Sequence, residues 1–358
     1  MTEKTVRLRK VGGFGFGSSA TDSGWRRTVG GIARQTAVWM MLVDLILVLV
    51  FGFMSANHTF LTVASFQNIG LNAAQVVTLA CAATFELAAG MIDISLGAAL
   101  VLSSVVGGEV IQHLGGTQSQ IQTGEYPHLG LALTVGILAA LATGAAFGLV
   151  NGLIVTRLRV NAFIATLATA GIGVGFAFII TNGADLPYIP TQFQDNFGAK
   201  IIFGIPAPAL AVAILVTILW AVIRYTRFGL HTLALGSSNV AAERAGLRVD
   251  RQTIKIFVLA GLLCGFAGLM DLSRFATTNV SGHTTDALAA VAGAVIGGTS
   301  LFGGTASIVG AVFGALLAVI LATGLVAVGL SPFYQQVAVG VVLIAAVYAD
   351  QRRQRRRE

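Results

Sequence analysis

The sequence predicts an all-α membrane protein, a polytopic bundle of about ten transmembrane helices with broken helices near residues 90–95 and 297–304. Two observations predict this class. Apolar residues make up 55% of the chain and charged residues only 10%, whereas a soluble protein carries about 25% charged residues. The mean hydropathy is +0.83. So much apolar surface requires the bilayer as its solvent.

Ten apolar runs define the expected spans, because roughly 20 apolar residues cross the hydrocarbon core as a helix. They lie near residues 37–54, 68–89, 94–112, 129–155, 161–181, 207–223, 254–272, 287–297, 305–330 and 333–349. Glycines four residues apart predict close packing between helices. These pairs are Gly144 and Gly148, Gly148 and Gly152, Gly171 and Gly175, Gly261 and Gly265, and Gly310 and Gly314.

The basic residues predict the orientation of the bundle. Residues 1–36 form an arm, expected to be disordered and cytoplasmic, with seven Lys and Arg, and residues 350–358 form a tail with five arginines. A central loop, residues 224–255, carries six more. The turn with Arg157 and Arg159 adds two. With both termini in the cytoplasm, 20 of the 22 Lys and Arg are expected to face inward, as the positive-inside rule requires. The domain between arm and tail, residues 37–349, is then the membrane domain.

The net charge of +7 lies in the arm and tail. Both flank membrane spans, where anionic lipid attracts basic residues. No aromatic residues alternate with the C-terminal arginines, so base stacking has no support. The charge therefore indicates the lipid bilayer as a partner and excludes nucleic acid.

Two segments interrupt the expected helices. Gly90-Met-Ile-Asp93-Ile-Ser95 contains an acid and no basic anchor, and Gly297–Gly304 follows a span of about eleven residues, too short to cross alone. One interpretation is a pair of breaks at membrane depth, where irregular backbone lines a translocation site. The other is a pair of tight turns at the inner surface. The sequence leaves both open.

The central loop contains a short candidate helix, Val240–Ala245. Asn239 is expected as its N-cap, Glu243 lies near the positive helix end, and Gly246 can adopt the left-handed conformation that ends a helix. The alternative is an ordinary solvated loop. On the first interpretation, one capped helix faces the cytoplasm.

Catalytic and nucleotide-binding motifs are absent from the sequence. It contains no G-x-x-x-x-G-K-[ST], no H-E-x-x-H and no G-x-S-x-G, and its five histidines are scattered. Its two cysteines lie within apolar runs and are expected to be core residues. We therefore expect no metal and no cofactor in this chain, and an intramembrane enzyme is disfavoured.

Ionisable and polar residues inside the spans are the candidates for a substrate path, because charge at bilayer depth costs at least ~2.5 kcal/mol. Glu86, about one turn before Gly90, is the first candidate, and a protonated glutamate bonded to a neighbouring helix is the alternative. Asp44 and Asp271 are expected to be structural. The remaining path candidates are Asn72, Gln75, Asp93, Ser95, Asn151, Thr166, Thr299 and Ser300.

Four stretches resemble one family. Residues 90–97, Gly-Met-Ile-Asp-Ile-Ser-Leu-Gly, resemble the G-G-I-D-L-S-V-G signature of permeases in ribose/xylose-type ABC sugar importers. The stretches 151–167, 236–247 and 294–304 resemble the same family in order and spacing, over about residues 60–349. Glu86, Met91 and Asp286 depart from the family pattern, which leaves the substrate open.

The resemblance implies a permease subunit in a bacterial inner membrane. Such a subunit translocates a sugar or polyol that an extracytoplasmic binding protein delivers. It pairs with a second copy or a paralogue, and a separate ABC ATPase consumes the ATP. The resemblance also implies that Asn239, Ala242, Glu243, Arg244, Ala245 and Gly246 contact that ATPase.

Two alternatives within transport remain. An ion-coupled secondary transporter would use Glu86 or Asp93 as its proton or sodium site. A branched-chain amino-acid ABC permease shares the general architecture, and the Asp93-Ile-Ser95 signature disfavours it. The sequence names neither the sugar nor the choice between homodimer and heterodimer.

Overall fold

The computed structural model describes residues 22–331 and single residues between 333 and 348, with side chains described from Thr36 onward apart from residues 56–58. Residues 1–21 of the expected arm, the tail 350–358 and most of the expected span 333–349 lie outside the described residues. The first helix, α1 (Asp22–Met54), begins inside the stretch expected as an arm.

Eight described helices are long and apolar enough to cross a membrane, which confirms an all-α polytopic fold. Besides α1 they are α2 (Val63–Ala88), α3 (Leu96–Gly115), α5 (Leu129–Arg157), α6 (Ala162–Thr181), α8 (Ala207–Tyr225), α11 (Val249–Phe275) and α13 (Ile308–Ala327). A ninth apolar helix, α12 (Asp286–Ile296), is too short to span alone. It matches the short span expected before the second interruption.

Short elements lie at the two ends of the bundle. They are η1 (Ala56–Leu61), α4 (Gln118–Gln122), α7 (Thr191–Phe193), η2 (Gln194–Gly198), α9 (Arg227–Ser237) and α10 (Asn239–Arg244). Strand β1 (Ile201–Ile202) pairs antiparallel with β2 (Ile205–Pro206), with Ile201 opposite Pro206.

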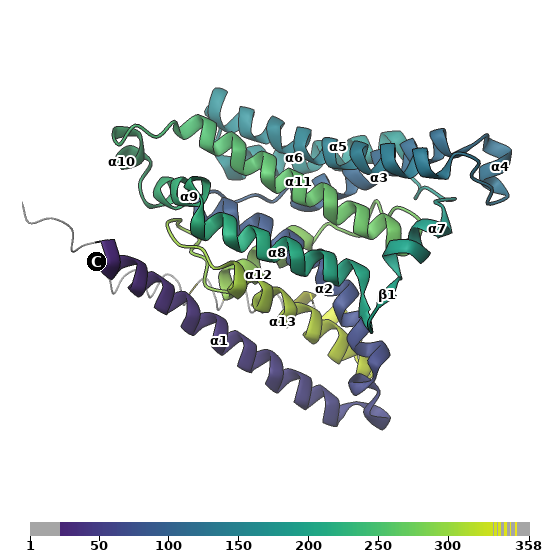
Figure 1. The fold of residues 1–358 in the computed structure, drawn as a ribbon, viewed down its shortest axis with the longest axis horizontal. Helices are drawn as coiled ribbons and strands as arrows, with labels where there is room; N and C mark the ends of the chain where they lie inside the picture. The colour runs from purple at the N-terminus through teal and green to yellow at the C-terminus, as the bar shows by residue number, and fades with distance from the viewer. Residues whose placement is uncertain are drawn as a thin grey trace, which may run out of the picture.

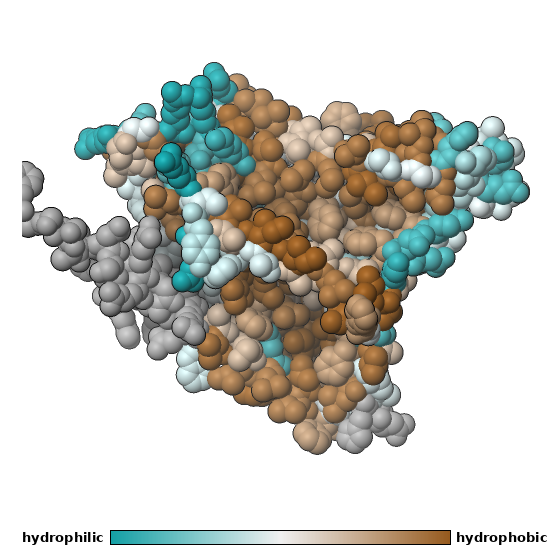
Figure 2. Space-filling model, in the orientation of Figure 1, coloured by the Kyte–Doolittle hydropathy of each residue, from teal (hydrophilic) through white to brown (hydrophobic). Residues whose placement is uncertain are grey.

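The ends of the bundle are polar and its middle is apolar. In Figure 1 the long helices run roughly along the long axis, with α9 and α10 at one end and α4, α7 and β1 at the other. Figure 2 shows hydrophilic residues gathered at these two ends and a broad hydrophobic band between them. An apolar band bounded by polar ends is the surface that a bilayer covers.

The long helices divide into central and peripheral ones. Between 67% and 78% of the apolar windows of α2, α3 and α11 is buried, against 22% to 28% for α1, α5, α6 and α8. The exposed Leu, Ile and Phe of the peripheral helices lie in the hydrophobic band. The central helices therefore carry the contacts that position an internal site.

Glycines allow α5 and α11 to pack closely. A Cβ placed on Gly148 of α5 would overlap the carbonyl of Phe257 in α11, and one on Gly261 would overlap the carbonyl of Gly144. This confirms the close packing expected from the glycine spacing in both helices. For Gly171 and Gly175 of α6 the expectation is wrong within this chain, because an added Cβ meets nothing within 4 Å.

Candidate functional site

The two interruptions expected from the sequence are real and contact each other. The first break, residues 89–95, follows α2, and the second break, residues 297–307, follows α12. The backbone N–H of Gly304 donates to the carbonyl of Ala88, with N and O 2.9 Å apart. Gly90, Gly303 and Gly304 all have positive φ, which glycine adopts without steric strain. The breaks therefore form one substructure.

Helix α9 packs against both breaks through Gly236. A Cβ on Gly236 would overlap the Ala88 carbonyl and would lie 2.6 Å from the backbone N of Gly304. We call this contact of Ala88–Gly90, Phe302–Gly304 and Gly236 the backbone junction. Because its atoms are mostly main chain, any residue larger than glycine at position 236 has to displace it.

The first break is held by polar side chains from two other helices. The Ile94 N–H donates to Thr166 Oγ1 in α6 over 3.2 Å. Asp93 Oδ1 accepts from the Ser95 N–H over 2.5 Å and from Ser95 Oγ over 2.6 Å, and Asn151 Nδ2 of α5 donates to Ser95 Oγ over 2.8 Å. We call Asp93, Ser95, Asn151 and Thr166 the Asp93 cluster. It supplies partners for backbone that leaves the helix inside the bundle.

Glu86 lies beside the Asp93 cluster. Its side chain is buried, and neither carboxyl oxygen has a hydrogen-bond donor among the described residues. The carboxyl groups of Glu86 and Asp93 are neighbours. Two buried carboxylates side by side repel each other, and one proton between them turns the repulsion into a hydrogen bond. The location fits the structural alternative for Glu86 as well as a place on the path.

Thr299 and Ser300 stabilise the second break from within. Thr299 Oγ1 accepts from the Ser307 N–H over 3.2 Å, and Ser300 Oγ accepts from the Phe302 N–H over 3.2 Å. Thr299 makes no hydrogen bond to the Asp93 cluster among the described residues. Their role here is local turn formation, so the structure does not bring all the candidate path residues to one place.

A second polar cluster surrounds His283, in the loop between α11 and α12. His283 Nε2 lies 3.2 Å from Asp271 Oδ2 and Nδ1 lies 2.8 Å from Asp286 Oδ2. Gln75 Nε2 of α2 donates to Asp286 Oδ2 over 3.2 Å. Nearby, Arg274 Nη1 donates to Asn72 Oδ1 over 2.8 Å. We call these six residues the His283 cluster.

The His283 cluster is balanced in charge. Each imidazole nitrogen faces a carboxylate, which favours the doubly protonated ring. Burial alone lowers the pKa of His283, but the adjacent carboxyl groups of Asp271 and Asp286 raise it to about 10. The ring is therefore charged at neutral pH. With Arg274, two positive groups face two carboxylates.

The sequence prediction found only part of the His283 cluster. Asn72 and Gln75 were expected as path residues, whereas Asp271 was expected to be structural, and Arg274, His283 and Asp286 were not singled out for a site. A signal was present in the charge pattern, because Arg274 is one of only two basic residues that the expected topology places opposite the basic loops. Its hydrogen-bond partner Asn72 lies 202 residues away in sequence, and only the fold joins the two.

The short helix expected in the central loop exists, with one correction. Ser238, and not Asn239, is the N-cap of α10: Ser238 Oγ accepts from the Ala241 N–H over 3.2 Å, and Asn239 is the first helical residue. Gly246 has φ +85° as expected, and the N–H groups of Gly246 and Leu247 bond to the carbonyls of Glu243 and Ala242. These two bonds form a Schellman motif.

Helix α10 is exposed on almost every side. Only Ala242 is buried, and Asn239, Glu243, Arg244, Ala245 and Gly246 are all exposed. Gln252 Nε2 of α11 donates to the Phe228 carbonyl of α9 over 3.1 Å and to Thr232 Oγ1 over 2.9 Å, which fixes α9 behind α10. The bundle thus presents a supported helix to solvent at one end (Figure 1).

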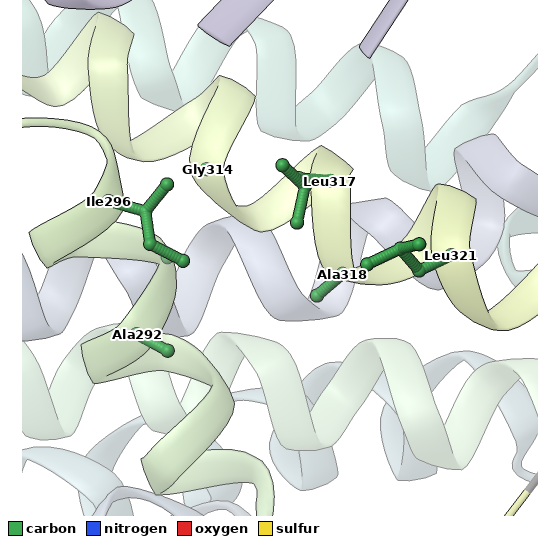
Figure 3. A pocket seen from close by; sticks show the side chains of 7 residues that line it. Ala292, Ile296, Gly314, Leu317, Ala318 and Leu321 are labelled. Carbon is green, nitrogen blue, oxygen red and sulfur yellow. The ribbon is translucent and has the colours of Figure 1, made fainter. Parts of the chain in front are cut away.

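One apolar pocket lies between α12 and α13. Its labelled lining residues are Ala292, Ile296, Gly314, Leu317, Ala318 and Leu321 (Figure 3). Every lining residue is apolar or glycine, so the pocket offers no partner to a hydroxylated ligand. Among the described residues no group of three His, Cys, Asp or Glu side chains is arranged to hold a metal ion.

Comparisons with known proteins assign the family. Residues 65–347 match the family described as "Branched-chain amino acid transport system / permease component". The chain is 31% identical over 339 residues to the ribose import permease of Escherichia coli strain K12, which covers 92% of this chain and 99% of that protein. It is 34% identical over 299 residues to the ribose import permease of Bacillus subtilis strain 168, covering 83% and 88%.

A third relative imports a different sugar by name. The L-arabinose ABC transporter permease of Azospirillum brasilense is 32% identical over 325 residues, covering 89% of this chain and 91% of that protein. No solved structure matches the chain. The matched region includes both breaks, both polar clusters and α10, and the chain therefore belongs to this family of multi-pass transport-system permease components.

Proposed function

We propose that this chain is the membrane subunit of an ABC importer that moves a sugar or polyol inward. Relatives over most of the chain are named as ribose and L-arabinose permeases, which supports a small sugar rather than an amino acid. The observation that carries the proposal is the backbone junction. It connects an exposed helix suited to a partner with the two broken segments inside the bundle.

The coupling route runs through three contacts. A separate ATPase binds α10, whose exposed Glu243 and Arg244 offer charges of both signs. Displacement of α10 moves α9, because only Ser238 separates the two helices. Gly236 near the end of α9 then moves the ends of α2 and α12 through the backbone junction. ATP binding has to supply about 5.5 kcal/mol to invert a 1:99 population.

The substrate path follows α2 from one polar cluster to the other. Gln75 and Asn72 of α2 lie in the His283 cluster, and Glu86 near the end of α2 lies beside the Asp93 cluster. Hydroxyl, amide and carboxyl groups both donate and accept hydrogen bonds, which suits a polyhydroxylated substrate. No side chain along this path provides covalent chemistry.

The orientation follows from the basic residues. With residues 1–36, the loop 224–255 and residues 350–358 on the cytoplasmic side of a bacterial inner membrane, α10 faces the ATPase. The opposite end, with α4, α7 and the β1–β2 hairpin, then faces the extracytoplasmic binding protein (Figure 1). A second permease copy or a paralogue completes the membrane assembly, within the domain 37–349.

Reconstituted transport tests the proposal. Vesicles containing the chain, its ATPase and its binding protein should accumulate labelled D-ribose or L-arabinose only when ATP is supplied. Glu243→Lys combined with Gly246→Pro should abolish uptake and stimulated hydrolysis, because proline cannot adopt the φ of +85° at Gly246. Glu125→Lys with Gly124→Pro is the matched control for binding of the ATPase, which it should leave unchanged, since Gly124 has φ +81° at the opposite end of the bundle from α10.

The same vesicles separate the alternatives. Uptake driven by a proton or sodium gradient without the ATPase would contradict the proposal and support a secondary transporter built on Glu86 or Asp93. Uptake of leucine in place of either sugar would support a branched-chain amino-acid permease. Unchanged coupling in the α10 double variant would contradict the ATPase contact alone.

A further inference from the structure

The His283 cluster joins elements that are far apart in sequence. The His283 side chain contacts Asp271 near the end of α11 and Asp286 at the start of α12, and Gln75 adds α2. The His283 backbone contacts α3 as well, because a Cβ on Gly97 would overlap the His283 carbonyl. His283 therefore lies where α3 and α12, the helices that follow or precede the two breaks, both begin.

Hydrogen bonds tie the same loop to the surface segment between α6 and α8. The Val280 N–H donates to Asp185 Oδ1 over 2.7 Å, and the Leu186 N–H donates to Thr278 Oγ1 over 2.8 Å. Thr277 Oγ1 donates back to the Leu186 carbonyl over 2.9 Å. A displacement of this surface segment would thus move residues 277–280, which lie only three to six residues before His283.

The contacts inside the cluster are close but incompletely aligned. Asp271 is 2% exposed and His283 8% exposed. Neither Asp271 oxygen nor His283 Nε2 makes a well-directed hydrogen bond to the described residues, although the Nε2 to Oδ2 distance is 3.2 Å. Buried polar atoms without good partners are costly, so such an arrangement gains from exchanging partners.

We propose that the His283 cluster is the gate that closes the substrate path on the side opposite α10, and that the contacts of His283 with Asp271 and Asp286 break when the path opens there. The inference rests on the proposed transport function for the existence of a path. It assigns the closure to named residues. When His283 moves away from Asp271, the positive charge of Arg274 still balances the Asp271 carboxylate, so the open state contains no unpaired buried charge.

Cysteine accessibility tests the gate without requiring transport. The parent carries Cys81→Ser, Cys264→Ser and Ala287→Cys, because Ala287 is 2% exposed and follows Asp286 directly. The full chain in lipid nanodiscs is treated with a membrane-impermeant maleimide. His283→Gln should raise the labelling rate at position 287 by roughly tenfold or more, since removing one member of a buried ion pair shifts the balance between states.

His113→Gln is the matched control. His113 also pairs with a carboxylate, that of Glu109 at 3.4 Å, but its side chain is 82% exposed. This variant should label at the parental rate. Equal labelling of the His283→Gln and His113→Gln variants would overturn the proposal. If His283→Gln does not assemble, Gln75→Leu is used instead, because it removes one hydrogen-bond donor to Asp286 and keeps the pairs of His283 with Asp271 and Asp286. Labelling of the Gln75→Leu variant at the parental rate would also overturn the proposal.

General loosening gives a different result. A second experiment uses the chain with its native Cys81, Cys264 and Ala287, in which both cysteines are fully buried. His283→Gln should leave them unreactive if only the gate opens, whereas their labelling would show a structural role and overturn the gate. If the unmodified complex takes up no sugar, the transport function is contradicted. The labelling rates still test the gate in that case, because they do not depend on transport.

Discussion

Replacement of Gly236 by alanine is the most direct test of the backbone junction. The added Cβ would overlap the Ala88 carbonyl, which cannot rotate away without losing its hydrogen bond from Gly304. Overpacking of this kind costs about 1–3 kcal/mol. At about 1.4 kcal/mol per factor of ten, the state with the junction packed loses roughly 5- to 150-fold in population.

The assay measures sugar uptake and ATP hydrolysis in the same vesicles. Gly236→Ala should lower the ratio of sugar moved to ATP hydrolysed by at least about fivefold, because hydrolysis continues while its effect on the breaks is lost. Gly171→Ala is the control, since its added Cβ meets nothing within 4 Å. A ratio within about twofold of the unmodified complex would refute the coupling route through α9.

Three further predictions concern the cap, the helix packing and the buried acid. Ser238→Ala should destabilise α10 by removing an N-cap worth about 1 kcal/mol, whereas Asn239→Ala keeps the cap, so hydrogen exchange of the α10 amides should quicken only in the first variant. Gly148→Leu should prevent assembly because it forces α5 from α11, while Gly130→Leu, with open space around it, should melt within a few degrees of the unmodified chain. Glu86→Gln should retain most uptake and Glu86→Leu should not, because only the amide keeps a donor for the neighbouring carboxyl; equal uptake by both would contradict the shared-proton arrangement.

The sequence predicted what depends on local chemistry. Apolar run length located the eight long spans and the short α12, and glycine spacing marked both α5 and α11 as helices that pack closely. Gly246 was correctly assigned a left-handed conformation, because few residues other than glycine end a helix in this way. The N-cap was misassigned by one residue, because Ser238 and Asn239 are both good caps and adjacent in sequence.

The sequence could not predict contacts that the fold creates over long separations. Gln75 and Asp286 are separated by 211 residues, and nothing near either identifies the other. Thr166 was a candidate only as a polar residue in a span, yet its hydroxyl group bonds to the backbone of the first break. Thr299 and Ser300 had the same sequence signal, but they bond within their own turn. Composition cannot separate these cases.

The backbone junction has a consequence for engineering the ligand range. Its contacts are made largely by main-chain atoms of glycines, while the groups suited to a hydroxylated ligand are side chains in the two polar clusters. On the proposed route, side chains that contact the substrate can therefore be exchanged without changing the backbone contact that couples α9 to the two breaks. On the same proposal, substitutions confined to the Asp93 and His283 clusters adapt this fold to different pentoses and hexoses.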